Sequence, residues 1–200
     1  MSDQRDQRDQ SDQSDRPDEA ALEELGQSLT DSGRAWAGAK DGISRGLGEW
    51  IRRTVADDQR LAVRAAVAAC SLVVPSYPEQ APELHAPRRY IDDMMAAIQG
   101  WLAEPTRERQ ERVRSTLDVT RDRHAWQDEH DLDHFWTLEA VDHASLAVWS
   151  GERSSYIVPL DYATSAARSV ACVFHALTTR GESRDRAVSA VVDAVRGARG

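Results

Sequence analysis

The chain has few cysteines and no long apolar run. Cys70 and Cys172 are the two cysteines among 200 residues, and each lies in an alanine-rich apolar stretch. Buried free cysteine behaves as a small hydrophobic residue, and a disulfide framework needs more cysteines and an oxidising compartment. No apolar stretch approaches the roughly 20 residues of a membrane-spanning helix, and no signal peptide opens the sequence. We therefore expect a cytoplasmic protein with neither disulfides nor a membrane span.

Basic charge is also scarce. Lys40 is the only lysine, and the net charge is −9, with 34 acidic side chains against 25 basic ones. Seven acids and three arginines in residues 1–19 contribute −4 of that charge, which leaves about −5 for the rest. Proteins that bind nucleic acid present a basic face to the phosphates. The charge balance therefore argues against nucleic acid as a partner and favours a basic one.

Motifs that name a reaction are missing as well. The sequence has no glycine-rich phosphate loop, no Walker pattern and no G-x-S-x-G nucleophile elbow. Neither cysteine lies at an evident helix start or beside a cation that would lower its pKa. We therefore predict no catalytic residue and no cofactor, and favour a non-enzymatic function.

Residues 1–16 repeat an Asp-Gln-Arg/Ser pattern with no apolar residue after Met1. Such a segment cannot bury enough apolar surface to offset the entropy lost on ordering, so it is predicted to be disordered. A solubilising tail is the favoured interpretation, and an interaction arm is the alternative.

From residue 57 onward, apolar side chains recur at helical spacing between caps, prolines and glycines. Asp57 or Asp58, Pro87, Thr106 and Asp161 each precede such a segment. The only run with strand-like composition is short and ends at a proline, so strands are essentially missing. The sequence predicts an all-α bundle of about six to eight helices, with residues 57–200 as the bundle domain.

Residues 17–56 are predicted to be an amphipathic, glycine-rich helical arm. In its second half Gly38, Gly42 and Gly46 form a stripe at spacing four beside an apolar stripe. Each interior glycine costs up to about 1 kcal/mol of helix stability, so this helix needs a partner surface. Glycines at this spacing allow close backbone approach. Three interpretations of residues 34–55 stay open: a helix packed on the bundle, a mobile arm for a partner, and a membrane-surface helix.

A histidine cluster is the one local candidate for metal binding. His130 and His134 are four residues apart and share a helix face, which is the spacing of two zinc ligands. Asp131 replaces the glutamate base of the H-E-x-x-H motif, and no Glu-x-x-His pair accompanies it. Acidic residues also suit a helix N-terminus, so surface histidines are the favoured interpretation and a metal site is the alternative.

Tryptophan and acid together suggest a protein-binding surface. Trp126 and Trp136 flank an acidic helix start and are expected to be partly exposed. Aromatic side chains rimmed with carboxylates favour an interface with a basic protein. The candidate partner-binding residues are Trp126, Asp128, Glu129, Asp133 and Trp136.

Three segments within about residues 57–180 follow a familiar order. They are RAAVAACSLVVP at 64–75, PRRYIDDMMAAIQGWLAEP at 87–105, and YATSAARSVACVFHAL at 162–177. This order of helices is similar to that of small all-helical immunity proteins of bacterial polymorphic toxin systems. The resemblance implies a non-enzymatic protein that binds and blocks a cognate toxin, and an acidic surface would suit a basic toxin.

Three functional hypotheses follow. The first is a cytoplasmic protein-binding protein, with an immunity protein as its specific form. The second is a metal-binding enzyme or carrier that uses His130 and His134. The third is a structural or cargo-type protein that docks through its N-terminal arm.

Overall fold

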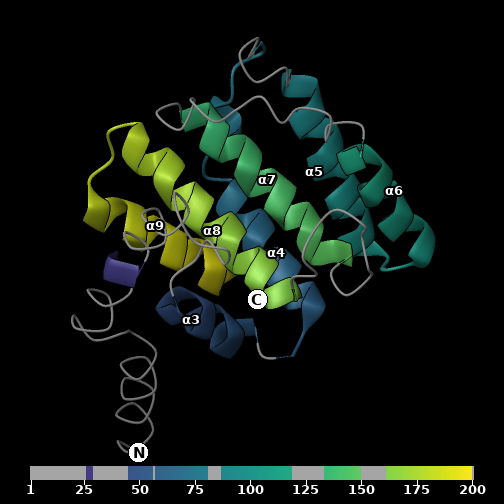
Figure 1. The fold of residues 1–200 in the computed structure, drawn as a ribbon, viewed down its shortest axis with the longest axis horizontal. Helices are drawn as coiled ribbons and strands as arrows, with labels where there is room; N and C mark the ends of the chain where they lie inside the picture. Colours follow the sequence, from purple (N-terminus) through teal and green to yellow (C-terminus); the bar gives the residue numbers. More distant parts are fainter. Residues whose placement is uncertain are drawn as a thin grey trace, which may run out of the picture.

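The computed structural model describes residues 26–28, 45–55, 57–80, 87–118, 133–149 and 161–199. Every regular element in these residues is a helix, so the predicted all-α fold is confirmed (Figure 1). The predicted disordered tail, residues 1–16, lies outside them. The elements are α3 (Arg45–Val55), α4 (Gln59–Cys70), the short 3-10 helix η1 (Val74–Ser76), α5 (Arg88–Ala103), α6 (Arg107–Asp118), α7 (Asp133–Trp149), α8 (Tyr162–Thr179) and α9 (Arg184–Gly197).

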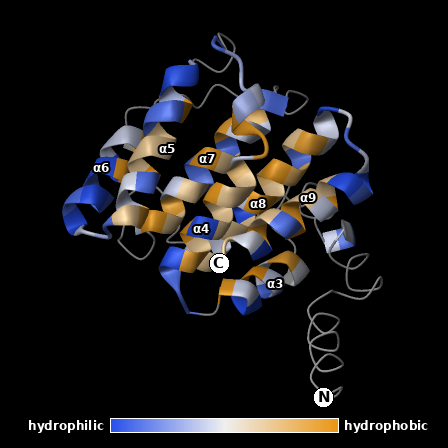
Figure 2. Ribbon diagram, turned by 180° about the vertical axis from the view of Figure 1, so that it is seen from behind, coloured by the Kyte–Doolittle hydropathy of each residue, from blue (hydrophilic) through white to orange (hydrophobic). Residues whose placement is uncertain are grey.

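Helices α7 and α8 form the centre of the bundle and pack on each other more extensively than any other pair of described helices. Helix α4 contacts both of them and α9, while α3 covers α8 from another side. Helices α5 and α6 pair with each other at the far side of α7 (Figure 1). Coloured by hydropathy, α7 and α8 are largely apolar and α6 is largely hydrophilic (Figure 2). The core therefore lies around α4, α7 and α8.

Helix starts follow local chemistry. The carboxylates of Asp58 and Asp161 accept hydrogen bonds from the backbone N–H groups of Leu61 and Thr164, at 3.1 Å and 2.7 Å. Each bond satisfies a donor that the first helical turn leaves without a partner. Both caps agree with the sequence prediction. Pro87 is at the N-cap of α5 rather than at the first helical position where it was expected.

The apolar run after Gln59 was expected to stay helical to residue 74. Helix α4 instead ends at Cys70, and a turn leads into η1 at Val74. The Ser71 hydroxyl donates to the Val67 carbonyl at 2.9 Å, which offers the backbone a local alternative to further helix. The chain therefore turns off α4 before the first proline.

Helix α3 belongs to the core. Leu47, Ile51 and Val55 are fully buried in the same apolar cluster as the central helices. A β-carbon at Gly46 would lie only 2.6 Å from the Ser28 hydroxyl oxygen, so this glycine permits a close approach. Of the three interpretations for residues 34–55, the described part, 45–55, matches a helix packed on the bundle.

Apolar length is the last feature that bears on location. No helix among the described residues combines the length and the hydrophobicity required to cross a lipid bilayer.

Candidate functional site

Most of the residues predicted to bind a partner or a metal fall outside the described part of the chain. Trp126, Asp128, Glu129 and His130 all do so. Their roles, and the pairing of His130 with His134, stay predictions. Within the described residues, no group of three histidine, cysteine, aspartate or glutamate side chains is placed to hold a metal ion.

Asp133 and His134 open helix α7. The Arg180 Nε donates to Asp133 Oδ2 at 2.7 Å, and Arg180 Nη2 reaches the carbonyl oxygen of Val73 at 3.4 Å. His134 Nδ1 lies 3.6 Å from the other oxygen of Asp133, and the His134 ring meets Tyr77 edge-on. Asp133 therefore joins the start of α7 to the end of α8, and one side of its carboxylate is already occupied by a cation.

Trp136 is buried, and the prediction that it is partly exposed is wrong. Only 7% of the residue is exposed. Its ring packs against Phe135 and His175, with ring centroids 5.1 Å and 4.9 Å away. The reason is that α7 is buried on nearly all sides, so a tryptophan on it has no outward face to occupy. Any direct contact between Trp136 and a partner would require the partner to reach into this packing.

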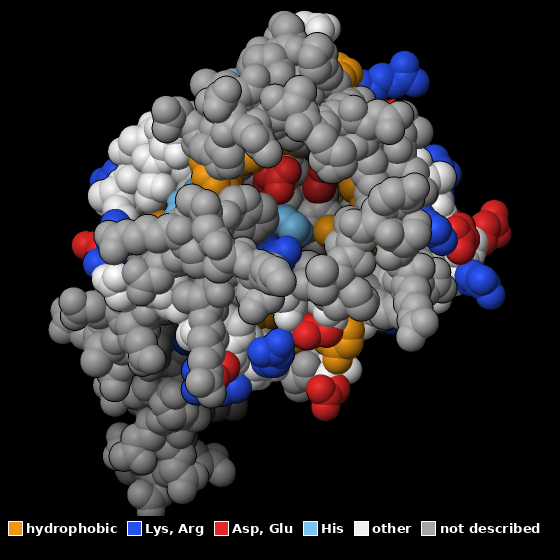
Figure 3. Space-filling model, viewed as in Figure 1, with side chains coloured by type: hydrophobic (Ala, Val, Ile, Leu, Met, Phe, Trp, Pro, Cys, Tyr) orange, Lys and Arg blue, Asp and Glu red, His pale blue; other side chains and the backbone are white. Residues whose placement is uncertain are grey.

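A second group of polar residues occupies the contact between α7 and α8. Glu139, Asp142 and His143 lie on α7, and Arg168 lies on α8. His143 Nε2 is 3.7 Å from Glu139 Oε2, one helical turn away. In Figure 3, acidic, histidine and arginine side chains meet in a hollow on the face over α7 and α8. We call these four residues the α7–α8 cluster.

Glu139 is the most perturbed acid in the described residues. Burial, and then the nearby charge of Asp142, raise its pKa to about 8, while Arg168 acts in the opposite direction. Its side chain is 21% exposed, and no hydrogen bond to its carboxyl group is formed within the described part of the chain. A carboxylate in such a place loses hydration without gaining donors, so the neutral acid is favoured at pH 7. Glu139 therefore presents a protonated carboxyl group next to a surface hollow.

His143 is the neutral neighbour of that acid. Burial, and then the charge of Arg168, lower its pKa to about 3. At pH 7 the imidazole is therefore uncharged, and the short distance to Glu139 is not an ion pair. The cluster holds its protons in the reverse of the usual arrangement for glutamate and histidine.

Asp142 is held from the other side by helix α5. The hydroxyl of Tyr90 donates to Asp142 Oδ1 at 2.5 Å. A short hydrogen bond to an ionised acceptor favours the charged form, so Asp142 stays an anion. The cluster thus contains one fixed carboxylate, one arginine and one neutral acid.

Two thiols lie behind the cluster. Burial raises the pKa of Cys70 to about 12, and burial followed by the charge of Glu139 raises that of Cys172 well above its usual value. Cys70 Sγ is 3.4 Å from the Ser169 hydroxyl, which itself donates to the Ala140 carbonyl at 2.8 Å. Both thiols are protonated at neutral pH and therefore lack the thiolate that nucleophilic catalysis needs.

The sequence predictions missed this cluster. Glu139 and Arg168 each stand inside an otherwise apolar helix, and that isolation is the signal that could have found them. A single charged residue on a helix that is buried all round must either pair across the core or serve a function. The search for Glu-x-x-His pairs did not include Glu139 and His143, which are four residues apart.

Comparison with known proteins provides no family. No protein-family model, no curated protein and no solved structure matches the chain.

Proposed function

We propose that this chain is a non-enzymatic protein-binding protein that captures a basic partner, and that the α7–α8 cluster is its recognition site. The observation that carries the proposal is Glu139, a carboxyl group beside a surface hollow without a hydrogen-bond donor in the described residues. Such a group is an acceptor in search of a cation.

The electrostatics favour a cation from outside the chain. Burial and Asp142 both oppose ionisation of Glu139, and Arg168 offsets them only in part. An arginine or lysine side chain of a partner, placed in the hollow, would donate to Glu139 and balance its charge with Asp142. Charge-assisted bonds of this kind are roughly twice as strong as neutral ones, most of all where water is excluded.

The specific form of the proposal is an immunity protein that neutralises a basic toxin. Three features support it: the similarity of helix order to bacterial immunity proteins, the net charge of −9, and the protonated state of both thiols. An acidic surface also accelerates association with a basic partner.

Co-expression with the product of the neighbouring gene tests this form. We expect that product to be toxic alone, harmless together with this chain, and co-purified with it. If it is neither toxic nor bound, the immunity hypothesis fails.

The recognition site is tested by Glu139→Gln in the same complex. The amide keeps the shape but cannot carry the charge that a bound cation requires, so we expect about a tenfold to hundredfold weaker binding, measured by calorimetry. The matched control is Glu182→Gln, which makes the same chemical change at an exposed residue before α9. Equal affinities of wild type and Glu139→Gln would exclude the α7–α8 cluster as the site.

A further inference from the structure

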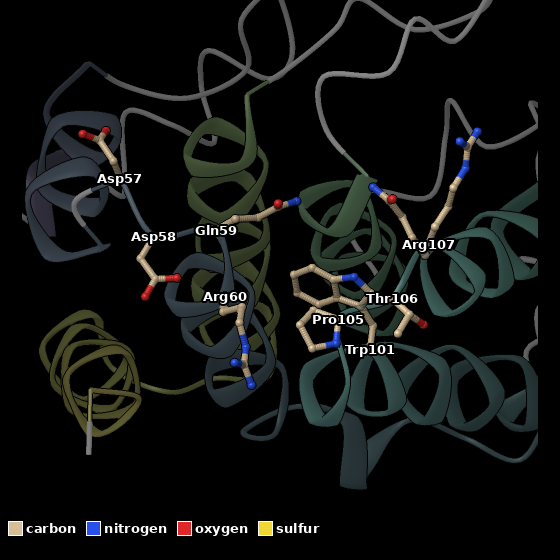
Figure 4. A pocket seen from close by; sticks show the side chains of 9 residues that line it. Asp57, Asp58, Gln59, Arg60, Trp101, Pro105, Thr106 and Arg107 are labelled. Carbon is tan, nitrogen blue, oxygen red and sulfur yellow. The ribbon is translucent and has the colours of Figure 1, made fainter.

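A separate cavity lies at the corner where α4, α5 and α6 meet. Its volume is about 540 Å³, within the range of small-molecule sites. Figure 4 shows its lining side chains converging from three helices that are distant in sequence. The lining residues are Asp57, Asp58, Gln59, Arg60, Trp101, Pro105, Thr106, Arg107 and Gln110.

The floor of this corner cavity is Trp101, which is 95% buried because only 5% of the residue is exposed. Its indole N–H has no hydrogen-bond partner in the described part of the chain, yet it is not sealed in the interior, because Trp101 lines the cavity. In Figure 4 the indole nitrogen points toward Thr106. An indole N–H is a donor only, and a buried donor that lacks an acceptor costs free energy. The side chain therefore directs an unused donor into the cavity.

More donors surround that nitrogen. Thr106 Oγ accepts the backbone N–H of Arg109 at 3.3 Å, which leaves its own hydroxyl proton available. Thr106 also begins α6, whose first N–H groups lack helical partners and carry the positive end of the dipole. Arg107 at the rim forms no ion pair with any described residue. The α6 side of the cavity is thus rich in donors and positive in potential.

The walls are fixed by bonds of their own. The side-chain amides of Gln59 and Gln110 donate to the Val148 carbonyl at 2.7 Å and 3.2 Å and close the end of α7. Arg60 Nη2 donates to the Leu102 carbonyl at 2.8 Å. These bonds join α4, α5, α6 and α7, so the cavity is pre-formed rather than a loose gap.

The two acids of the cavity do not answer its donors. Asp58 is occupied as the cap of α4. In Figure 4 both Asp57 and Asp58 point away from Trp101. Acceptors for Trp101 and Thr106 must therefore come from a ligand.

We propose that the corner cavity binds a small carboxylate that carries a flat apolar group. The carboxylate accepts hydrogen bonds from Trp101 and Thr106 at the N-terminus of α6, with Arg107 as the nearby cation. The flat group lies on Pro105 and the exposed edge of the Trp101 ring. Specificity for a carboxylate over a neutral amide follows from the charge at the α6 end.

Trp101 gives this proposal a direct readout. In a proton–nitrogen correlation spectrum of the full chain, each of the six tryptophans contributes one indole signal, and Trp101→Phe identifies the signal of Trp101 by its loss. Benzoate is the probe, with benzamide as its uncharged isostere and inorganic phosphate as the anion without a flat group. We expect benzoate to move the Trp101 signal saturably, and to bind about tenfold more tightly than benzamide.

Arg107→Gln should weaken benzoate binding several-fold, and Arg112→Gln, on the same helix but outside the cavity, should not change it. A Trp101 signal that benzoate does not move would overturn the proposal. Equal responses to benzoate and benzamide, or to benzoate and phosphate, would overturn the assignment of a flat carboxylate. Unchanged binding in Arg107→Gln would overturn it as well.

Discussion

Helices α6 and α7 carry charge in opposite ways. On α6 most charged side chains face water, and only Val113 and Leu117 enter the core. On α7 nearly every position is buried, and the charges of Glu139 and Asp142 are held inside the bundle. The charged residues of α6 form ion pairs with long, exposed geometry, such as Arg109 with Glu104 at 3.6 Å. Those of α7 have shifted protonation states instead.

The difference teaches that location, rather than number, decides what a charge costs. An exposed pair contributes at most about 1 kcal/mol, because water solvates both partners almost as well when they are apart. A buried charge loses hydration that only a few neighbours can replace. Helix α6 is therefore expected to tolerate substitution, while α7 and its partner α8 depend on each charged residue.

The largest effect should come from Arg168→Met. This change removes the cation that opposes the buried charges of Glu139 and Asp142, so we expect a loss of about 2–4 kcal/mol in the free energy of unfolding. Urea denaturation at pH 7 provides the measurement. Arg112→Met on α6 is the matched control, and it should change stability by less than about 0.5 kcal/mol. If the two substitutions cost the same, the contrast between α6 and α7 is wrong.

A smaller effect is expected from pH. Glu139 titrates near 8 in the folded chain and near its ordinary value of 4.5 in the unfolded one, so the folded state binds the extra proton between these values. Stability is therefore lost as the pH rises from 4.5 through 8. The loss is on the order of 2 kcal/mol, because the side chain is partly exposed.

Histidine acts in the opposite direction. Burial lowers the pKa of His143 to about 3 and of His175 to about 4, below the ordinary value of 6.5, so the unfolded state binds more protons. His175 faces the rings of Trp136 and Phe174, and His143 faces Glu139 and Arg168. Below pH 6.5 two histidines outweigh one glutamate, and stability falls with pH.

These three groups place the maximum of stability near pH 6.5. Thermal melts between pH 4 and 9 should show it, and Glu139→Gln should flatten the alkaline side alone. A wild-type melting temperature that is constant from pH 6.5 to 9 would contradict the buried state of Glu139.

The smallest effect concerns the tether between Asp133 and Arg180. Both side chains are about one-quarter to one-third exposed, and the bond is short at 2.7 Å. Arg180→Ala should therefore cost about 1 kcal/mol, since it also removes the contact with Val73. Arg109→Ala, which breaks the exposed pair with Glu104, should cost less than half of that in the same urea assay. Equal losses would show that the tether is no stronger than a surface pair.

The sequence predicts local features of this fold well. The caps at Asp58 and Asp161 and the buried central helices follow from residue type and periodicity, which depend on neighbours along the chain. Exposure of Trp136 was predicted wrongly because acidic neighbours suggested an open helix start. Helix α7 has no strongly polar face, so periodicity could not show which side would be covered.

The sites depend on distances across the bundle that periodicity does not contain. Glu139 and Arg168 come from two helices, and their meeting depends on the register in which α7 packs on α8. The corner cavity draws on three helices, and its central donor, Trp101, reads in the sequence as an ordinary core residue. What the sequence did contain was the oddity of a lone charge inside each apolar helix.

The packing of α3 determines how the chain can be dissected. A deletion that reaches residue 56, the natural test of a docking arm, would also remove Leu47, Ile51 and Val55 from the core. It would leave the Arg199 guanidinium without the Thr54 carbonyl, to which it donates at 2.9 Å. Lost binding in such a fragment would report a damaged fold rather than a missing arm. A deletion that stops before Gly26 keeps Ser28 against Gly46 and can therefore question the N-terminal segment alone.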